Sequence, residues 1–260
     1  MAILSKPVLK QSIKSNWVMW LVFTGILIFY AFVMVFAVYF GGDMFGDILG
    51  GPVDISPAGL MLNLVVMMFY DIMGIGFILV LIYVIIIGNK LVASEVDKGS
   101  LSFILNTPIT RKQIVFSKAL FFIASITAMI LIMTLIITIS TALVGVGLDF
   151  GALWRVALGF WLYSLALSGF AFAASCIFNK SRFSILLGAG IPLLFFLITT
   201  LAQIDPMFYF LRIFSLNTLF DTANIVAATN FIWKFAVLGV IAIGLYAVGI
   251  ARFLKKDLPI

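Results

Sequence analysis

The chain has 260 residues, of which 64% are hydrophobic and only 10% are charged, whereas soluble domains carry about 25% charged residues. Its 16 basic and 10 acidic side chains cannot cover the surface of a 28.6 kDa globule, so the composition excludes a soluble enzyme. The chain has no His and a single cysteine, Cys176, which excludes hydrolysis with a His base, His-ligated zinc and an internal disulfide.

Six segments are apolar and long enough to cross a bilayer as helices, because a hydrocarbon core of about 30 Å needs about 20 helical residues. Their residues do not alternate between polar and apolar, which excludes the strands of a membrane β-barrel. We therefore predict an all-α polytopic membrane protein with a single transmembrane domain over residues 1–260. The six spans are expected at about residues 17–40, 60–88, 119–147, 156–179, 183–204 and 233–254.

The distribution of Lys and Arg predicts that both termini are cytoplasmic, by the positive-inside rule. The net charge of +6 arises from basic residues that flank the spans, so we expect no nucleic acid partner. The basic residues on the outer side are Arg155, Arg212 and Lys234. Those on the inner side are Lys6, Lys10, Lys14, Lys90, Lys98, Arg111, Lys112, Lys118, Lys180, Arg182, Arg252, Lys255 and Lys256.

The residues before the first span predict an amphipathic helix that lies in the plane of the lipid headgroups. Apolar residues recur at helical spacing up to Trp17, and Lys6, Lys10 and Lys14 form a stripe on another face. Such a stripe binds anionic lipid, so membrane lipid is an expected partner. The alternative is a short disordered basic tail, since Pro7 weakens an uninterrupted helix.

The longest inner connection, residues 89–118, predicts a contact surface. Its sequence, NKLVASEVDKGSLSFILNTPITRKQIVFSK, is longer than a connection between two spans requires. Apolar residues from Leu101 onward have the spacing of a short amphipathic helix, which Pro108 ends. Thr110 and Gln113 then form a capping box that starts a helix running into the third span. The alternative is an ordinary positive-inside loop whose charges face water.

Seven residues of this connection follow the pattern E-x-x-x-G-x-L-x-x-x-L-x-x-P-x-x-R-x-x-x-x-x-x-K. They are Glu95, Gly99, Leu101, Leu105, Pro108, Arg111 and Lys118. This arrangement resembles the cytoplasmic loop of ABC-2 type transporter permeases, the transmembrane subunits of ATP-binding cassette exporters. The six spans, the inner termini, the basic N-terminal helix and the long second-to-third connection are similar to that family over the whole chain.

The resemblance implies a permease that dimerises, with itself or with a paralogous copy, in a bacterial plasma membrane. It also implies a separate ATPase subunit that binds ATP and magnesium and whose cleft receives a short cytoplasmic coupling helix between residues 99 and 107. Glu95 and Arg111 would brace or contact the ATPase, Gly99 would allow the turn, and Pro108 would fix the helix end. The chain contains no G-x-x-x-x-G-K-[ST] motif, so we expect neither a cofactor nor enzymatic activity in this chain. The residues implied in ATPase coupling are Glu95, Gly99, Leu101, Leu105, Pro108 and Arg111.

Residues 205–230 are too apolar for an ordinary outer loop and predict one or two short re-entrant helices at the outer membrane boundary. Asp205 and Pro206 have the pattern of a helix start. In ABC-2 permeases, helices at this place resemble a lid over the exit. Anchoring at the interface without gating is the alternative. The lid residues would be Phe208, Phe210, Phe214 and Phe220.

Asp71 is the only acid inside a predicted span, where a carboxylate at mid-bilayer costs about 2.5–3.5 kcal/mol. It is either a solvated span end near the outer interface or a residue that lines the conduit. Small residues in the fourth and sixth spans predict close helix packing, and Cys176 is expected to be an inert packing residue. These small residues are Ser164, Ser168, Gly169, Ala171, Ala173, Ala174, Ser175, Gly239, Gly244 and Gly249.

Three classes of function compete for this chain. An ATP-driven exporter explains the long inner loop, the missing nucleotide motif and the scarcity of ionisable groups in the membrane. An ion-coupled carrier or channel would place several acids or bases at mid-depth, and an intramembrane enzyme would need a clustered acid–base or metal set. We therefore expect outward transport of an amphipathic or hydrophobic cargo: a peptide toxin, an antimicrobial peptide or a drug. The alternatives are ABC-driven export of a lipid or glycolipid, and an ion-coupled carrier or channel that uses Asp71.

Overall fold

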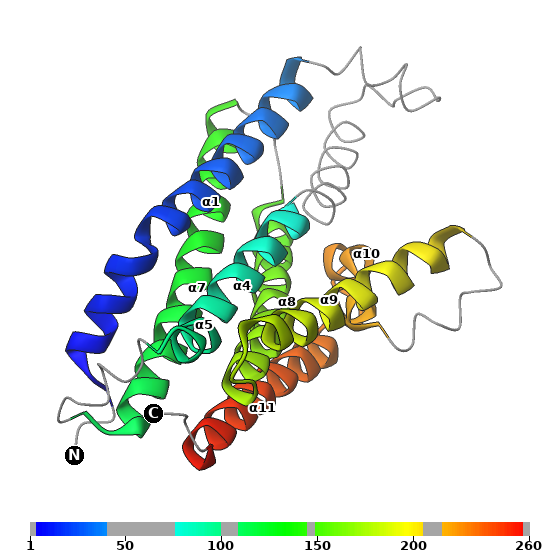
Figure 1. Ribbon diagram of the computed structural model, residues 1–260. Helices are drawn as coiled ribbons and strands as arrows, with labels where there is room; N and C mark the ends of the chain where they lie inside the picture. Colours follow the sequence, from blue (N-terminus) through cyan, green and yellow to red (C-terminus); the bar gives the residue numbers. More distant parts are fainter. Residues whose placement is uncertain (1–3, 41–75, 100–108, 145–148, 205–214, 257–260) are drawn as a thin grey trace.

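The fold is a bundle of long helices (Figure 1). The computed structural model describes residues 4–40, 76–99, 109–144, 149–204 and 215–256, and these residues contain no strand. The helices are α1 (Lys6–Phe40), α4 (Phe77–Leu91), α5 (Ala93–Asp97), α7 (Arg111–Val144), α8 (Phe150–Ile177), α9 (Ser181–Ile204), the 3-10 helix η3 (Leu216–Leu219), α10 (Thr222–Val226) and α11 (Ile232–Lys255). The prediction of an all-α polytopic membrane protein is confirmed.

Five of these helices, α1, α7, α8, α9 and α11, are long and apolar enough to cross a membrane. The remaining predicted span, at residues 60–88, ends within α4, and its residues 60–75 lie outside the described residues together with Asp71. All five helices begin before the expected spans, and the differences are largest for α1 at Lys6, α7 at Arg111 and α8 at Phe150. A charge ends an apolar window, but it does not end a helix.

The N-terminal amphipathic segment is helical, but it continues into the first span without a break, as the first turns of α1. Pro7 lies in the first turn, where its missing N–H is not needed. Asn16 Nδ2 donates to Ser12 O at 2.8 Å across the expected boundary. At 35 residues α1 is about 52 Å long, more than the about 30 Å of a hydrocarbon core, so part of it extends beyond the core.

The first turns of α1 pack on α7 through a partly polar face. Ser5, Val8 and Ser12 are buried, and the Ser5 N–H donates to Ser117 Oγ at 2.9 Å. Farther along, Trp20 Nε1 donates to the Ser125 carbonyl at 2.9 Å. The lysine stripe remains exposed, as predicted, but so do Leu4, Ile13 and Trp17 of the expected apolar face. The buried face is thus set by the contact with α7.

Helix α8 lies at the centre of the bundle and packs against α4, α7, α9, α10 and α11. Its small residues are buried, which confirms that they serve helix packing. A Cβ on Gly88 of α4 would lie 2.7 Å from Ala171 Cβ, and one on Gly249 of α11 would lie 3.1 Å from Ala173 Cα. Gly239 and Gly244 have no such close contact, so only part of the glycine pattern in the sixth span is explained by this packing.

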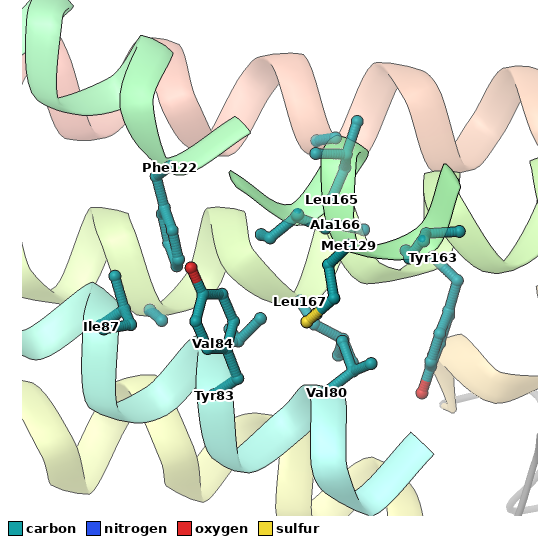
Figure 2. Close-up of a cluster of buried hydrophobic side chains, with 14 of the residues drawn as sticks. Val80, Tyr83, Val84, Ile87, Phe122, Met129, Tyr163, Leu165, Ala166 and Leu167 are labelled. Atoms are coloured by element: carbon teal, nitrogen blue, oxygen red, sulfur yellow. The ribbon is translucent and has the colours of Figure 1, made fainter. Parts of the chain in front are cut away.

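The core is formed mainly by α4, α7 and α8. Figure 2 shows Tyr83 and Val84 of α4 among side chains of the other two helices, including Phe122 and Met129 of α7 and Leu167 of α8. Cys176 is fully buried, as expected for a packing residue. In contrast, α1, α9 and α11 carry large exposed apolar side chains along their length, which suits contact with lipid.

The starts of α1, α7 and α9 lie at the same end of the bundle as α5 and the ends of α4, α8 and α11 (Figure 1). All thirteen Lys and Arg residues that were predicted to be inner are described residues of this end, which we call the basic end. Among the described residues, Arg155 and Lys234 lie at the opposite end.

Candidate functional site

At the basic end, the helical path of the backbone is interrupted between α4 and α5, inside the bundle. Val92, with φ −129° and ψ −63°, interrupts the helix and leaves peptide groups without helical partners. Residues Leu91, Val92 and Ala93 are all buried, so these groups need partners from elsewhere. The Ala93 N–H donates to Ser175 Oγ of α8 at 2.8 Å, and the Leu91 carbonyl accepts from Lys118 Nζ of α7. Side chains of α7 and α8 therefore supply the hydrogen-bond partners that these peptide groups lack within their own helices.

Lys118 holds both sides of this break. Its side chain is 2% exposed, and Nζ donates to the Leu91 carbonyl of α4 and to Glu95 Oε2 of α5. The bond to Glu95 is an ion pair, which compensates the desolvation of the ammonium group. The first and last residues of the sequence pattern are thus partners inside one chain.

Both ends of the loop that contains the predicted coupling helix are fixed. Gly99 adopts a left-handed conformation, φ 71°, and its N–H donates to the Val96 carbonyl at 3.0 Å, so the turn expected at this glycine is present. At the other end, the predicted capping box is confirmed: the Thr110 N–H donates to Gln113 Oε1 at 3.0 Å, and the Gln113 N–H donates to Thr110 Oγ1 at 3.4 Å. Leu101, Leu105 and Pro108 lie outside the described residues, so the coupling helix stays a prediction.

Arg111 connects the start of α7 to the end of α11. Its Nη1 donates to the Lys256 carbonyl at 3.2 Å, and Lys256 Nζ donates to the Cys176 carbonyl of α8 at 3.1 Å. Partial burial lowers the pKa of Lys256 below its ordinary value, although the nearby Cys176 opposes this shift. Arg111 and Glu95 are therefore each bound to a different part of the basic end rather than to each other.

Further contacts join the remaining helices at this end. Asp97 Oδ2 accepts from the Ser181 N–H at the start of α9 at 3.3 Å, and Asn89 Nδ2 donates to Ser181 Oγ at 2.6 Å. Lys90 Nζ donates to the Ser15 carbonyl of α1 at 2.9 Å. Together with Lys118, Arg111 and Lys256, these side chains form what we call the basic-end network.

Sequence reasoning placed Glu95, Gly99 and Arg111 at this site but missed the roles of Lys118, Ser175 and Lys256. Lys118 carried a signal, because a lysine followed directly by an apolar span must either reach water or find a partner. Ser175 and Lys256 carried none, since both act through distant backbone groups.

The outer segment after residue 214 is attached to α8 and α9. Phe220 is buried, and its ring lies 6.0 Å from that of Phe160 and 5.8 Å from that of Tyr163. The Tyr163 hydroxyl donates to Asn217 Oδ1. Ser215 Oγ donates to the Phe195 carbonyl of α9 at 3.0 Å. The other predicted lid residues, Phe208, Phe210 and Phe214, lie outside the described residues.

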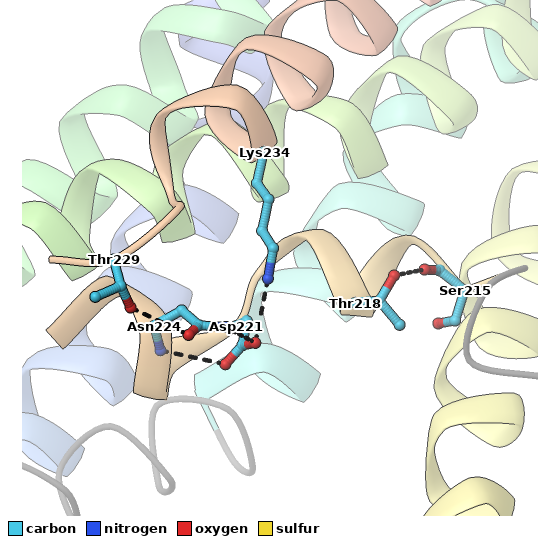
Figure 3. A network of polar contacts seen from close by, with 6 residues as sticks. All are labelled: Ser215, Thr218, Asp221, Asn224, Thr229 and Lys234. Carbon is cyan, nitrogen blue, oxygen red and sulfur yellow. Dashed lines mark hydrogen bonds and ion pairs between the residues drawn. The ribbon is translucent and has the colours of Figure 1, made fainter. Parts of the chain in front are cut away.

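Asp221 attaches this segment to α11 (Figure 3). Lys234 Nζ donates to Asp221 Oδ2 at 3.1 Å, Asn224 Nδ2 donates to the same oxygen, and the Asn224 N–H donates to Oδ1 at 3.4 Å. Burial raises the pKa of Asp221, but the hydrogen bonds from Lys234 and Asn224 outweigh it and hold the pKa below its ordinary value. The described residues contain no group of three or more acids or cysteines that could hold a metal ion.

Nearly the whole chain matches a known protein family. A family model described as "ABC-2 family transporter protein" matches residues 1–258. No curated protein and no solved structure matches the chain.

The Glu95–Lys118 pair is expected to behave as one energetic unit. Glu95→Gln leaves a buried ammonium group without a counter-charge and should lower the free energy of unfolding by about 3 kcal/mol. In a Lys118→Met background that charge is absent, so the same substitution should cost less than about 1 kcal/mol. Thermal unfolding of the four variants in detergent measures the difference, with Asp149→Asn, at an exposed ion pair of the opposite end, as the control. Equal costs in both backgrounds would show that the two side chains are not coupled.

The Asp221 contacts should stabilise the opposite end in a pH-dependent manner. Asp221→Asn removes the ion pair with Lys234 and should lower the free energy of unfolding by about 1.5 kcal/mol at pH 7. Because the folded pKa is depressed, this difference should persist down to about pH 5 and shrink as the pH falls below about 4. Asp149→Asn, which alters an exposed ion pair, is the matched control. A difference that grows on acidification would contradict the assignment.

Proposed function

Because the chain belongs to the ABC-2 family of transporter proteins, we propose that it is the permease of an exporter that moves an amphipathic or hydrophobic cargo outward. The chain is a multi-pass membrane subunit, and the ATPase activity of such transporters resides in a partner subunit. In this proposal the partner alone binds ATP and magnesium. The free energy of ATP hydrolysis in the partner reaches the permease through residues 99–110 at the basic end.

The observation that carries the proposal is the basic-end network. A force applied to a loop moves the spans only if the ends of that loop are firmly attached to them. Here one loop end follows α5, which Lys118 joins to α4 and α7, and the other is capped at the start of α7. Movement of residues 100–108 would therefore be transmitted directly to α4 and α7.

The charge distribution supports a cytoplasmic basic end. Loops rich in Lys and Arg remain on the cytoplasmic side, and the basic end carries thirteen such residues. Both termini would then be cytoplasmic, in the compartment that supplies ATP. The exposed apolar faces of α1, α9 and α11 leave room for lipid and for a second permease copy, and symmetric pairing of two copies would enclose a conduit.

The cargo is proposed from the scarcity of charge within the bundle. The described spans are lined by apolar and small side chains, which suits a peptide toxin, an antimicrobial peptide or an apolar drug better than an ion. At the outer end, Phe220, Ser215 and Asp221 attach the segment to α8, α9 and α11. These contacts favour an anchored cap over a freely moving lid.

Substitutions at the basic end should separate ATP hydrolysis from transport. Arg111→Ala and Glu95→Ala should leave membrane insertion intact but lower the cargo moved per ATP hydrolysed by about tenfold, because the loop loses its attachment to the spans. Leu105→Asp should weaken assembly with the ATPase, because it places a charge in an apolar contact. Reconstituted vesicles give the transport and hydrolysis rates, and native mass spectrometry gives the yield of a complex with two permeases and two ATPases.

Arg182→Ala is the matched control, since Arg182 is an exposed arginine of the same end that lies outside the network. It should retain the parent ratio of transport to hydrolysis. If all three test variants transported normally and gave the parent yield of complex, residues 89–118 would be an ordinary solvated loop and the proposed coupling route would be wrong.

A further inference from the structure

An apolar groove of about 610 Å³ runs between α7 and α11 on the surface of the bundle. Leu165 of α8 and Tyr246 of α11 are buried at its base, and Ala251 is one of the small residues that leave it hollow. Phe116 and Leu254 line it near the basic end. The volume is within the range of about 300–1,000 Å³ of small-molecule sites.

The groove has the length of one membrane leaflet. Its α11 wall runs from Leu254, at the inner end of the predicted sixth span, to Ala242, and twelve residues of helix span about 18 Å. Half of a hydrocarbon core of about 30 Å is about 15 Å. With Leu254 at the boundary of the hydrocarbon core, one end of the groove would lie at the headgroup level of the basic end, and the other would reach the middle of the bilayer.

The polar end of the groove carries positive charge without a counter-charge from the described residues. Lys112 is the one charged lining residue, and it forms no hydrogen bond or ion pair with another described residue. Lys255 is exposed and continues the helical stripe of Ala247 and Ala251 past the groove. The Arg111–Lys256 hydrogen bond holds the two helix ends together at this point. The described acids of the basic end, Glu95 and Asp97, are bound to Lys118 and Ser181.

We propose that this groove binds one anionic phospholipid from the leaflet at the basic end. One acyl chain lies between α7 and α11 against Leu165 and Tyr246, and the phosphate lies between Lys112 and Lys255. The match in length fixes the leaflet, and the two lysines select a negative headgroup. A helix of a second copy would fill the apolar part, but the described acids of the basic end, which are bound elsewhere, would offer neither ammonium group a counter-charge. The bound lipid is distinct from the cargo and does not depend on what the transporter exports.

The test is lipid retention by the full-length chain, measured by native mass spectrometry in detergent with equal amounts of phosphatidylglycerol and phosphatidylcholine. The parent chain should retain at least about five times as much phosphatidylglycerol as phosphatidylcholine. Lys112→Gln combined with Lys255→Gln should reduce this preference to less than about twofold, because the headgroup loses its charge partners. Ala251→Trp should reduce retention of both lipids, because the indole fills the groove.

Two matched controls separate the groove from the general surface. Lys98→Gln combined with Lys180→Gln removes two exposed lysines of the same end that do not line the groove, and Val240→Trp adds the same bulk to an exposed position of α11. Both should behave as the parent. A photoreactive acyl chain on phosphatidylglycerol should crosslink to peptides that contain Phe116 or Ile250.

Equal retention of the two lipids by the parent, or retention that the groove variants do not change, would overturn the proposal. The proposal would also fail if Ala251→Trp altered the pairing of permease copies while lipid retention stayed constant, because the groove would then be an interface between chains. The lysine variants lie on the surface and remain informative if the tryptophan variant does not fold.

Discussion

The structure depends on one buried ammonium group. The chain leaves its helical path between Leu91 and Ala93 in a place that water does not reach, and a free peptide carbonyl there is costly unless a donor is supplied. Lys118 supplies the donor and is itself neutralised by Glu95. The Leu91 carbonyl needs the Lys118 ammonium group as a donor, and the ammonium group needs the Glu95 carboxylate as a counter-charge. Removing one of these groups alone therefore leaves another buried group without its partner.

This arrangement connects the two ends of the bundle through α8. Near the basic end, Ser175 Oγ of α8 accepts a hydrogen bond from the Ala93 N–H at the helix break. In the other half of the same helix, Tyr163 and Phe160 contact Asn217 and Phe220 of the outer segment. A helix of 28 residues is about 42 Å long and is stiff when its small residues are packed on the surrounding helices. A displacement at the basic end therefore has a rigid path to the outer segment.

Local patterns predicted the parts of the site that are local in sequence. The capping box of Thr110 and Gln113 and the burial of the small residues of α8 follow from neighbouring residues, and both are confirmed. The turn at Gly99 was implied by the family resemblance, and Gly99 adopts the left-handed conformation of a turn. The break after Leu91 was not predicted, because it contains neither glycine nor proline. Its partners are 27 residues away at Lys118 and 82 residues away at Ser175, a pairing that only the packed bundle creates.

The starts of α1 and α7 show a second limit of local sequence patterns, because hydropathy placed both starts too late. Charges such as Lys14 and Lys118 ended the apolar windows, yet the backbone remained helical through both. Hydropathy measures contact with lipid, whereas the helix end depends on caps and on packing against other helices. The extension of α7 past Lys118 is what brings the ammonium group to the break and the capping box to the loop.

Lys118 fixes α5, and with it the start of the loop, relative to α7. The most direct measurement is the distance distribution between spin labels at Lys98→Cys and Lys112→Cys, two exposed positions on either side of the loop, by double electron–electron resonance. Cys176 is fully buried and does not interfere with labelling. The parent chain should give one narrow distance, and Lys118→Met should broaden or shift it. A distribution in Lys118→Met that superimposes on the parent would show that Lys118 does not hold α5 in place.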